Sequence, residues 1–365
     1  MNDSALRGFH EGRKARWSVA GGEIADYGHP DREYLALTRT AALLDLSARG
    51  RLVLLGADRL KFLNGQVTNL VKDLREGEGC YAALVTAKAK MVSDLHVHAL
   101  ANEVLLDFEP GYTAAVMARL EPFILSDDVQ MVDAAPHYGL LHVAGPRAEE
   151  AVVRGLGGER IPSVELGSQA LKHGEWGDFY VVRHARYGVP GWDLYFPVAT
   201  IGVATESLLL DVVQVGGGLC GWGVGEVARV EAGIPRFGVD MDGTTMPPEA
   251  GIEARAISYS KGCYSGQEVI ARIRTYGQVA KALRGLKLSG GGQALPPRGT
   301  KLGREGKEVG WITSAVTSPR VGGRIALGYV RRECNQPGDV LSVVVEGGGM
   351  TAEVVPLPFV GLMLA

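Results

Sequence analysis

The sequence lacks an apolar N-terminal stretch and any long hydrophobic run. Its first residues, MNDSALRGFHEGRKARW, contain neither an apolar segment nor a cleavage site, so we expect no secretory signal. The longest apolar stretches are too short to span a bilayer or are interrupted by charge, as at Asp211. We therefore expect a cytoplasmic protein with no membrane partner.

Cysteine is scarce and unpaired in the sequence. The four cysteines, Cys80, Cys220, Cys263 and Cys334, lie far apart and form no C-x-x-C pair. This spacing excludes a disulfide scaffold and a zinc ribbon. It predicts four free thiols in a reducing compartment.

The chain also lacks an excess of charge of one sign. Lys and Arg total 38 against 41 Asp and Glu, which gives a net charge of -3. Proteins that coat nucleic acid are usually strongly basic, so we expect no direct nucleic-acid partner. With 365 residues, 46% hydrophobic and 22% charged, the composition is that of a globular chain of two or three domains.

Glycine, by contrast, is abundant at 51 residues, which is typical of turns and bulges in a β-rich chain. Hydrophobic spacing predicts strands at 80–84, 91–100, 103–108, 178–182 and 192–197, and helices at 110–125 and 224–232. From Lys281 onward, short strands such as ALRGLKL and RIALGYV alternate with Gly and Pro. This pattern predicts an α+β region followed by a small all-β domain.

The segment MVSDLHVHAL alternates, which places Asp94, His96 and His98 on one face of its strand. These side chains could converge on a metal, but no fourth ligand is identifiable. We therefore expect no metal site, and a solvated sheet face or a ligand pocket is the alternative.

The most informative stretch is KGCYSGQEVIAR, which begins at Lys261. Ser265 and Glu268 have the spacing of a capping box, which predicts a helix over 266–276. Cys263 would then lie just before a helix N-terminus, with Lys261 adding positive charge, and both effects lower a thiol pKa. The alternative interpretation is a buried cysteine that only fills space.

KGCYSGQE resembles the K-G-C-Y-x-G-Q-E signature of YgfZ-type folate-binding proteins, which are relatives of the glycine-cleavage T-protein, the aminomethyltransferase. The segments ARGRLVLLGADRLKFLNGQVTN, RYGVPGWDLYFP and ARVEAGIPRFGVDMD are similar to family segments that occur in the same order. The resemblance implies a three-domain ring around a tetrahydrofolate pocket, with two discontinuous α+β domains and a C-terminal β-barrel. The expected domains are 1–47 with 139–240, 48–138 with 241–278, and 279–365.

The resemblance also implies a set of site residues. The expected folate-binding residues are Asp193, Arg229, Tyr81, Asp94, Tyr264 and Gln267. In this set Asp193 would hold the pterin edge, and Asp94 would lie near the reactive folate nitrogen. Cys263, Lys261 and Asp94 are the residues expected to carry chemistry. Without the resemblance, Asp193 is equally well a solvated or capping residue and Arg229 a surface charge on a helix.

These features favour a tetrahydrofolate-binding protein that supports assembly or repair of iron–sulfur client proteins, including tRNA-modifying enzymes, through the thiol of Cys263. An aminomethyltransferase that moves a one-carbon unit to tetrahydrofolate, using Asp94 and Arg229, is the alternative. A folate-binding module without chemistry of its own is the third possibility. The KGCYSGQE motif favours the first of these.

Overall fold

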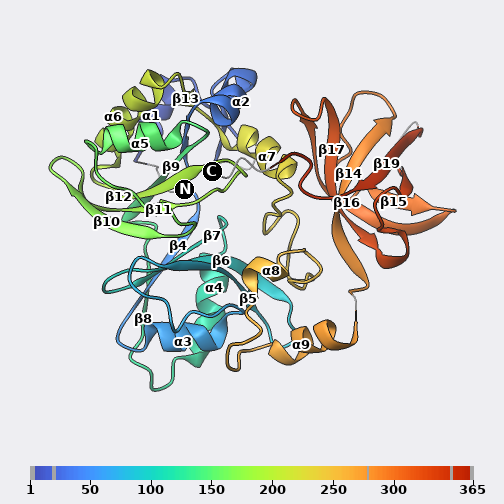
Figure 1. The fold of residues 1–365 in the computed structure, drawn as a ribbon, viewed down its shortest axis with the longest axis horizontal. Helices are drawn as coiled ribbons and strands as arrows, with labels where there is room; N and C mark the ends of the chain where they lie inside the picture. Colours follow the sequence, from blue (N-terminus) through green and yellow to red (C-terminus); the bar gives the residue numbers. More distant parts are fainter. Residues whose placement is uncertain (1–4, 19–21, 278, 346–347, 362–365) are drawn as a thin grey trace.

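The computed structural model describes residues 5–18, 22–277, 279–345 and 348–361. These residues form two packed β-sheets with helices on their outer faces, and a β-barrel at one side (Figure 1). Near the N-terminus, helix α1 (Arg7–Gly12) precedes a short ribbon of β1 (Arg16–Trp17) and β2 (Ile24–Asp26).

The first sheet has six strands in the order β10-β11-β12-β9-β3-β13, and β13 alone pairs parallel. Its strands are β3 (Ala42–Asp45), β9 (Tyr138–Ala144), β10 (Ser168–His173), β11 (Gly177–Arg183), β12 (Gly191–Pro197) and β13 (Gly218–Leu219). Its outer face packs against the amphipathic helices α5 (Ala148–Gly155) and α6 (Ile201–Gln214). Helices α2 (Pro30–Arg39) and α7 (Trp222–Glu231) contribute to the core on the other face.

The second sheet has five antiparallel strands in the order β5-β6-β7-β4-β8. Its strands are β4 (Gly50–Leu55), β5 (Gly79–Val85), β6 (Met91–Ala99), β7 (Val104–Phe108) and β8 (Gln130–Asp133). Helices α3 (Arg59–Gln66) and α4 (Thr113–Leu120) cover its outer face. The strands of this sheet lie between β3 and β9 in the chain, so the first sheet is discontinuous in sequence.

The inner faces of both sheets carry polar side chains, because strand residues alternate between faces. On β6, Leu95 and Val97 pack against the helices, and Asp94, His96 and His98 lie on the inner face. On β12, Trp192, Leu194 and Phe196 join the helix-covered core, which leaves Asp193 and Tyr195 facing inward. The space between the sheets is therefore a mixed polar and apolar interior.

The C-terminal region closes into a barrel with the strand order β14-β17-β16-β15-β18-β19. Its strands are β14 (Lys281–Gly290), β15 (Lys301–Arg304), β16 (Lys307–Ser318), β17 (Gly323–Arg331), β18 (Val340–Val343) and β19 (Met350–Val355), with the 3-10 turn η2 at Arg332–Cys334. Closure leaves no free edge strand.

Two buried carboxylates of the α7 region hold the barrel in place. Glu231 accepts hydrogen bonds from the hydroxyls of Tyr34 on α2 and Ser318 on β16. Asp240 accepts from Thr313 and Ser314 of β16. The barrel therefore lies beside α7, as Figure 1 shows.

The predicted fold class is confirmed, with two α+β regions, one of them interrupted in sequence, and a C-terminal barrel. The domain boundaries stay a prediction, and residues 1–4, 19–21, 278, 346–347 and 362–365 of those ranges lie outside the described residues. Among the described residues, no helix is long and apolar enough to cross a membrane.

Two local predictions were wrong. The helix expected over 110–125 is shorter, because Pro122 follows α4 and the chain continues as a 3-10 turn at Glu121–Phe123, η1. The capping box does not form before α9 (Gln267–Tyr276), because Gly266 is the N-cap residue, in a left-handed conformation with φ of 86°. Glu268 instead pairs with Arg272 on the exposed helix surface.

Candidate functional site in the cavity between the sheets

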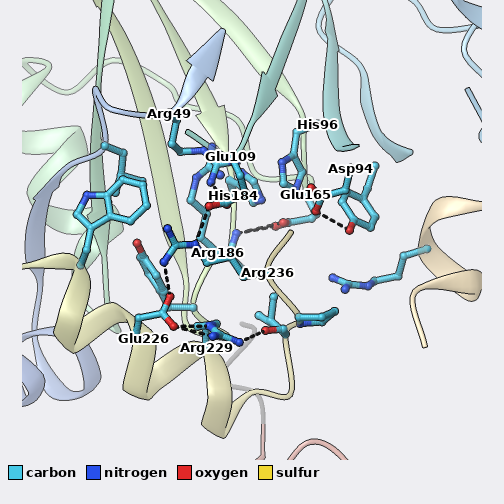
Figure 2. Close-up of a pocket in the computed structure, with 18 residues that line it drawn as sticks. Arg49, Asp94, His96, Glu109, Glu165, His184, Arg186, Glu226, Arg229 and Arg236 are labelled. Carbon is cyan, nitrogen blue, oxygen red and sulfur yellow. Dashed lines mark hydrogen bonds and ion pairs between the residues drawn. The ribbon is translucent and has the colours of Figure 1, made fainter. Parts of the chain in front are cut away.

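A cavity opens between the two sheets and the segment that follows α7 (Figure 2). Asp94 and His96 lie on one side of it, and Glu226 and Arg229 lie on the opposite side. The lining residues are Leu46, Arg49, Tyr81, Asp94, His96, Glu109, Glu165, His184, Ala185, Arg186, Tyr187, Trp222, Glu226, Arg229, Ile234, Pro235, Arg236 and Arg255.

Tyr81 and Asp94 form a buried pair on neighbouring strands. The Tyr81 hydroxyl donates to Asp94 Oδ2 at 2.8 Å, and Asp94 is only 8% exposed. Burial and the nearby Glu109 raise the pKa of Asp94 to about 6, although the Tyr81 hydrogen bond opposes the shift. The carboxyl group can therefore take up and release a proton near neutral pH.

Asp193 lies beneath the cavity and does not line it. Its carboxylate accepts from His142 Nδ1 at 2.8 Å, His184 Nδ1 at 2.9 Å, and Arg186 Nε and Nη2 at 2.9 and 2.6 Å. Burial favours the neutral acid, but Arg186 and the two histidines hold the pKa of Asp193 well below its usual value. In this structure Asp193 therefore acts on the cavity through His184 and Arg186, and its direct contact with a ligand stays a prediction.

Arg229 is a buried structural cation at the cavity wall, and its interpretation as a surface charge is wrong. It donates to Glu226, to Asp240 and to Ser314 of the barrel. Although burial opposes it, the carboxylates of Asp240 and Glu226 raise the pKa of Arg229. Its donors are occupied, so it anchors the wall and ties it to the barrel.

A second arginine, Arg236, joins three carboxylates from distant parts of the chain. It donates to Glu109 at 2.7 Å, to Glu226 at 2.9 Å and to Glu23 at 2.8 Å. Arg49 also pairs with Glu109. These contacts fix Glu109 and Glu226, two of the acidic side chains that line the cavity.

The histidines of β6 have different environments. His96 lines the cavity, and burial lowers its pKa to about 4. His98 is fully buried away from the lining, and neither ring nitrogen has a hydrogen-bond partner among the described residues. Within those residues no group of three or more His, Cys, Asp or Glu side chains is placed to hold a metal ion.

Lys261 has a structural environment that its sequence context did not predict. Its Nζ donates to the carbonyl oxygens of Asn64, Val67 and Asn69 at 2.6–2.7 Å. Asn64 lies in the last turn of α3, and Val67 and Asn69 follow the end of that helix. Burial lowers the pKa of Lys261 to about 8. The three N–H donors of Lys261 are occupied by carbonyls, so none is free for Cys263, and a role of its charge at that thiol stays a prediction.

The remaining motif residues lie outside the cavity lining. Tyr264 packs in a core with Tyr81, Ala83 and Met91, and its backbone N–H donates to the side chain of Gln267. Cys263 is exposed, whereas Cys220 and Cys334 are buried and Cys80 is half-buried. The interpretation of Cys263 as a buried filler is therefore wrong.

Sequence reasoning missed the arginine and the two histidines that surround Asp193. Arg186 lies in the same RYGVPGWD segment, seven residues before Asp193, and this proximity to an acidic strand residue was the available signal. His184, nine residues before Asp193, offered the same signal, whereas Glu165 bonds to Ala185 from a separate segment and offered none.

The family models divide the chain in agreement with the fold. The model of the GCVT N-terminal domain matches residues 22–261, and that of the glycine cleavage T-protein C-terminal barrel domain matches residues 281–361. The chain belongs to the glycine cleavage T-protein family.

Relatives within this T-protein family are distant but nearly full-length. An aminomethyltransferase of Thermotoga neapolitana is 27% identical over 333 residues, 90% of this chain and 88% of that protein. A chloroplastic protein of Arabidopsis thaliana, whose name suggests a transferase, is 28% identical over 92% of this chain and 77% of its own length. The crystal structure of aminomethyltransferase T from Bartonella henselae has a TM-score of 0.87 at 22% identity, covers 99% of this chain and 98% of its own, and has the same fold.

The raised pKa of Asp94 predicts a pH-dependent cost to stability. Because its folded pKa exceeds the unfolded value, the stabilising contribution is present at low pH and is lost as the pH rises through about 6. The wild type should therefore lose stability relative to Asp94→Asn as the pH rises. The free energy of unfolding of Asp94→Asn minus that of the wild type should increase by about 2 kcal/mol from about pH 4.5 to about pH 7.5. Chemical denaturation of both proteins at the two pH values measures this difference, and an unchanged difference would show that Asp94 has an ordinary pKa.

The exposure of Cys263 predicts its order of alkylation. Burial raises the pKa of the Cys80 thiol to about 12 and holds the pKa of the Cys220 thiol well above its usual value, which disfavours their reactive thiolates. Native protein treated with iodoacetamide should be labelled first at Cys263, and the other three should react only after unfolding. Mass spectrometry of time points reports the order, and faster labelling of Cys80 would contradict it.

Proposed function

We propose that this T-protein family member binds tetrahydrofolate in the cavity between the sheets and supports iron–sulfur client proteins through Cys263. The observation that carries the folate assignment is the buried Tyr81–Asp94 pair in the cavity wall. Tyr187 and Trp222 add aromatic surface to the same wall, which suits a flat pterin ring. When bound, tetrahydrofolate supplies nucleophilic nitrogens that carry one-carbon units.

The cavity residues fit a ligand that combines a planar ring with a basic nitrogen. Asp94 Oδ2 accepts from Tyr81, which leaves Oδ1 available to the cavity. Asp94 would orient and exchange a proton at the reactive folate nitrogen, and a pKa of about 6 suits that task. Tyr81 would keep the carboxyl group in place.

The thiol would act on a different surface from the folate. Cys263 is exposed and is not part of the cavity lining, so it is available to a protein partner. Lys261, two residues earlier, ties the motif to the end of α3 and so holds the exposed segment in position. The KGCYSGQE signature supports the proposal that the partners are iron–sulfur proteins, including tRNA-modifying enzymes, in the cytoplasm.

Aminomethyl transfer to tetrahydrofolate is the second candidate. The specific observation in its favour is again Asp94, a titratable carboxyl group at the cavity wall, and relatives such as the Thermotoga neapolitana protein are named aminomethyltransferases. The two candidates share the folate site but differ in the need for Cys263. Turnover of an aminomethyl donor by purified protein would favour the second.

Calorimetric titration with tetrahydrofolate tests the shared site. The wild type should bind, and Asp94→Asn should weaken binding by about tenfold or more, because a charge-assisted hydrogen bond is lost. Asp339→Asn, which alters a partly buried ion pair on the barrel, is the matched control and should bind like the wild type. No binding by the wild type would contradict the proposed function.

Replacement of Cys263 tests the iron–sulfur role. In cells lacking the native gene, Cys263→Ser should fail to restore the activity of iron–sulfur enzymes while the purified variant keeps its tetrahydrofolate affinity, since the thiol lies outside the cavity. The matched control is Cys334→Ser, a buried barrel residue, which should restore activity if it folds. Full restoration by Cys263→Ser would remove the thiol from the function.

A further inference from the structure

His184 and Arg186 present open hydrogen-bonding atoms to the cavity. The side chains are only 7% and 6% exposed, and both line the cavity. His184 Nδ1 and Arg186 Nη2 bond to the same oxygen of Asp193, Oδ2. Arg186 Nη1 and His184 Nε2 have no hydrogen-bond partner among the described residues, and neither is enclosed by protein.

Asp193 determines that His184 Nε2 accepts a hydrogen bond, beside the donor Arg186 Nη1. An ionised carboxylate only accepts hydrogen bonds, so His184 Nδ1 must carry the proton that it donates. Burial and the adjacent Arg186 hold the pKa of His184 well below its usual value, so the ring is neutral and Nε2 is an acceptor. Arg186 Nη1 is always a donor, so the cavity offers one donor and one acceptor that are anchored on one carboxylate oxygen.

We propose that Arg186 and His184 bind the lactam edge of the pterin ring, with Arg186 Nη1 donating to the C4 carbonyl oxygen and His184 Nε2 accepting from N3–H. This inference rests on the proposed folate function and names the residues that select the ring. Asp193 is a positioning residue, because it acts through His184 and Arg186. A lactam has an acceptor and a donor on adjacent atoms, which is the complement of the pair that the cavity offers.

The geometry favours this assignment over a direct carboxylate contact. Both oxygens of Asp193 are occupied by three buried side chains, so Asp193 has no open position for the N3–H and 2-amino groups of a pterin. Arg186 is further fixed by Asp107 on β7 at 2.6 Å. The donor therefore keeps its direction before the ligand arrives, which reduces the entropic cost of binding.

A pair of ligands that differ only at this edge tests the proposal on the wild type. Tetrahydroaminopterin carries a 4-amino group in place of the carbonyl and has an acceptor at N3, so its hydrogen-bonding polarity is reversed. Titration calorimetry should give tetrahydrofolate an affinity at least about tenfold higher than that of tetrahydroaminopterin, because both contacts become donor–donor or acceptor–acceptor.

Variants then assign the selectivity to residues. Arg186→Gln, His184→Phe and Asp193→Asn should each shrink the ratio of the two affinities toward one. Arg154→Gln and His137→Gln, at exposed positions, are matched controls that should keep the wild-type ratio. If a buried variant fails to fold, the absence of a preference in the wild type still overturns the proposal.

The outcomes separate this inference from the function on which it rests. Equal affinity for the two ligands, a preference for the 4-amino compound, or variants that weaken both ligands equally would overturn the lactam assignment and leave folate binding intact. Failure of the wild type to bind tetrahydrofolate would overturn the proposed function, and the lactam assignment with it.

Discussion

The buried bridge from Asp107 through Arg186 to Asp193 is the interaction on which the cavity depends. Asp107 belongs to the second sheet and Asp193 to the first, and Arg186 donates to both at 2.6 Å. All three side chains are nearly or fully buried, so their desolvation is costly and is offset only while every partner is present. Loss of one partner would leave an uncompensated charge in the interior.

This bridge is needed because both sheets place most of their apolar side chains on the outer faces, which leaves polar side chains facing each other between the sheets. Trp192, Leu194 and Phe196 of β12 pack against α5 and α6, and Leu95 and Val97 of β6 pack against α3 and α4. The inner faces also contain an apolar cluster, which includes Val53 and Leu140, but their polar side chains must find partners across the gap. The cavity is thus the part of this polar interior that lies open to a ligand.

Alternation along β6 was sufficient to predict that Asp94 and His96 share a face, and both line the cavity. The resemblance to the T-protein family predicted the fold class, and it placed Tyr81 and Asp94 in one pocket, where both line the cavity. The first prediction depends only on neighbouring residues of one strand, and the second on sequence motifs that relatives share. Neither requires knowledge of contacts between distant residues.

The features that the sequence did not predict depend on contacts between distant residues. Lys261 bonds to carbonyl oxygens nearly two hundred residues earlier in the chain, which no spacing rule predicts. The capping box failed because Gly266 adopts φ of 86°, with Thr86 so close that a β-carbon at Gly266 would clash, so the tertiary contact decides how α9 begins. Asp193 is withdrawn from the cavity by His142, His184 and Arg186, and only the last two are near it in sequence.

Charge balance within the cavity constrains what the proposed site can select. Five arginines and four carboxylic acids line it, and Arg49, Arg186, Arg229 and Arg236 each pair with acidic groups. Because these cations are already neutralised locally, a ligand gains little from bringing net charge into this part of the cavity. Selection must then come from the direction of individual donors and acceptors, and those directions are set by the carboxylates that hold each arginine and histidine. In such a site a change of one hydrogen-bonding edge on the ligand matters more than a change of its total charge.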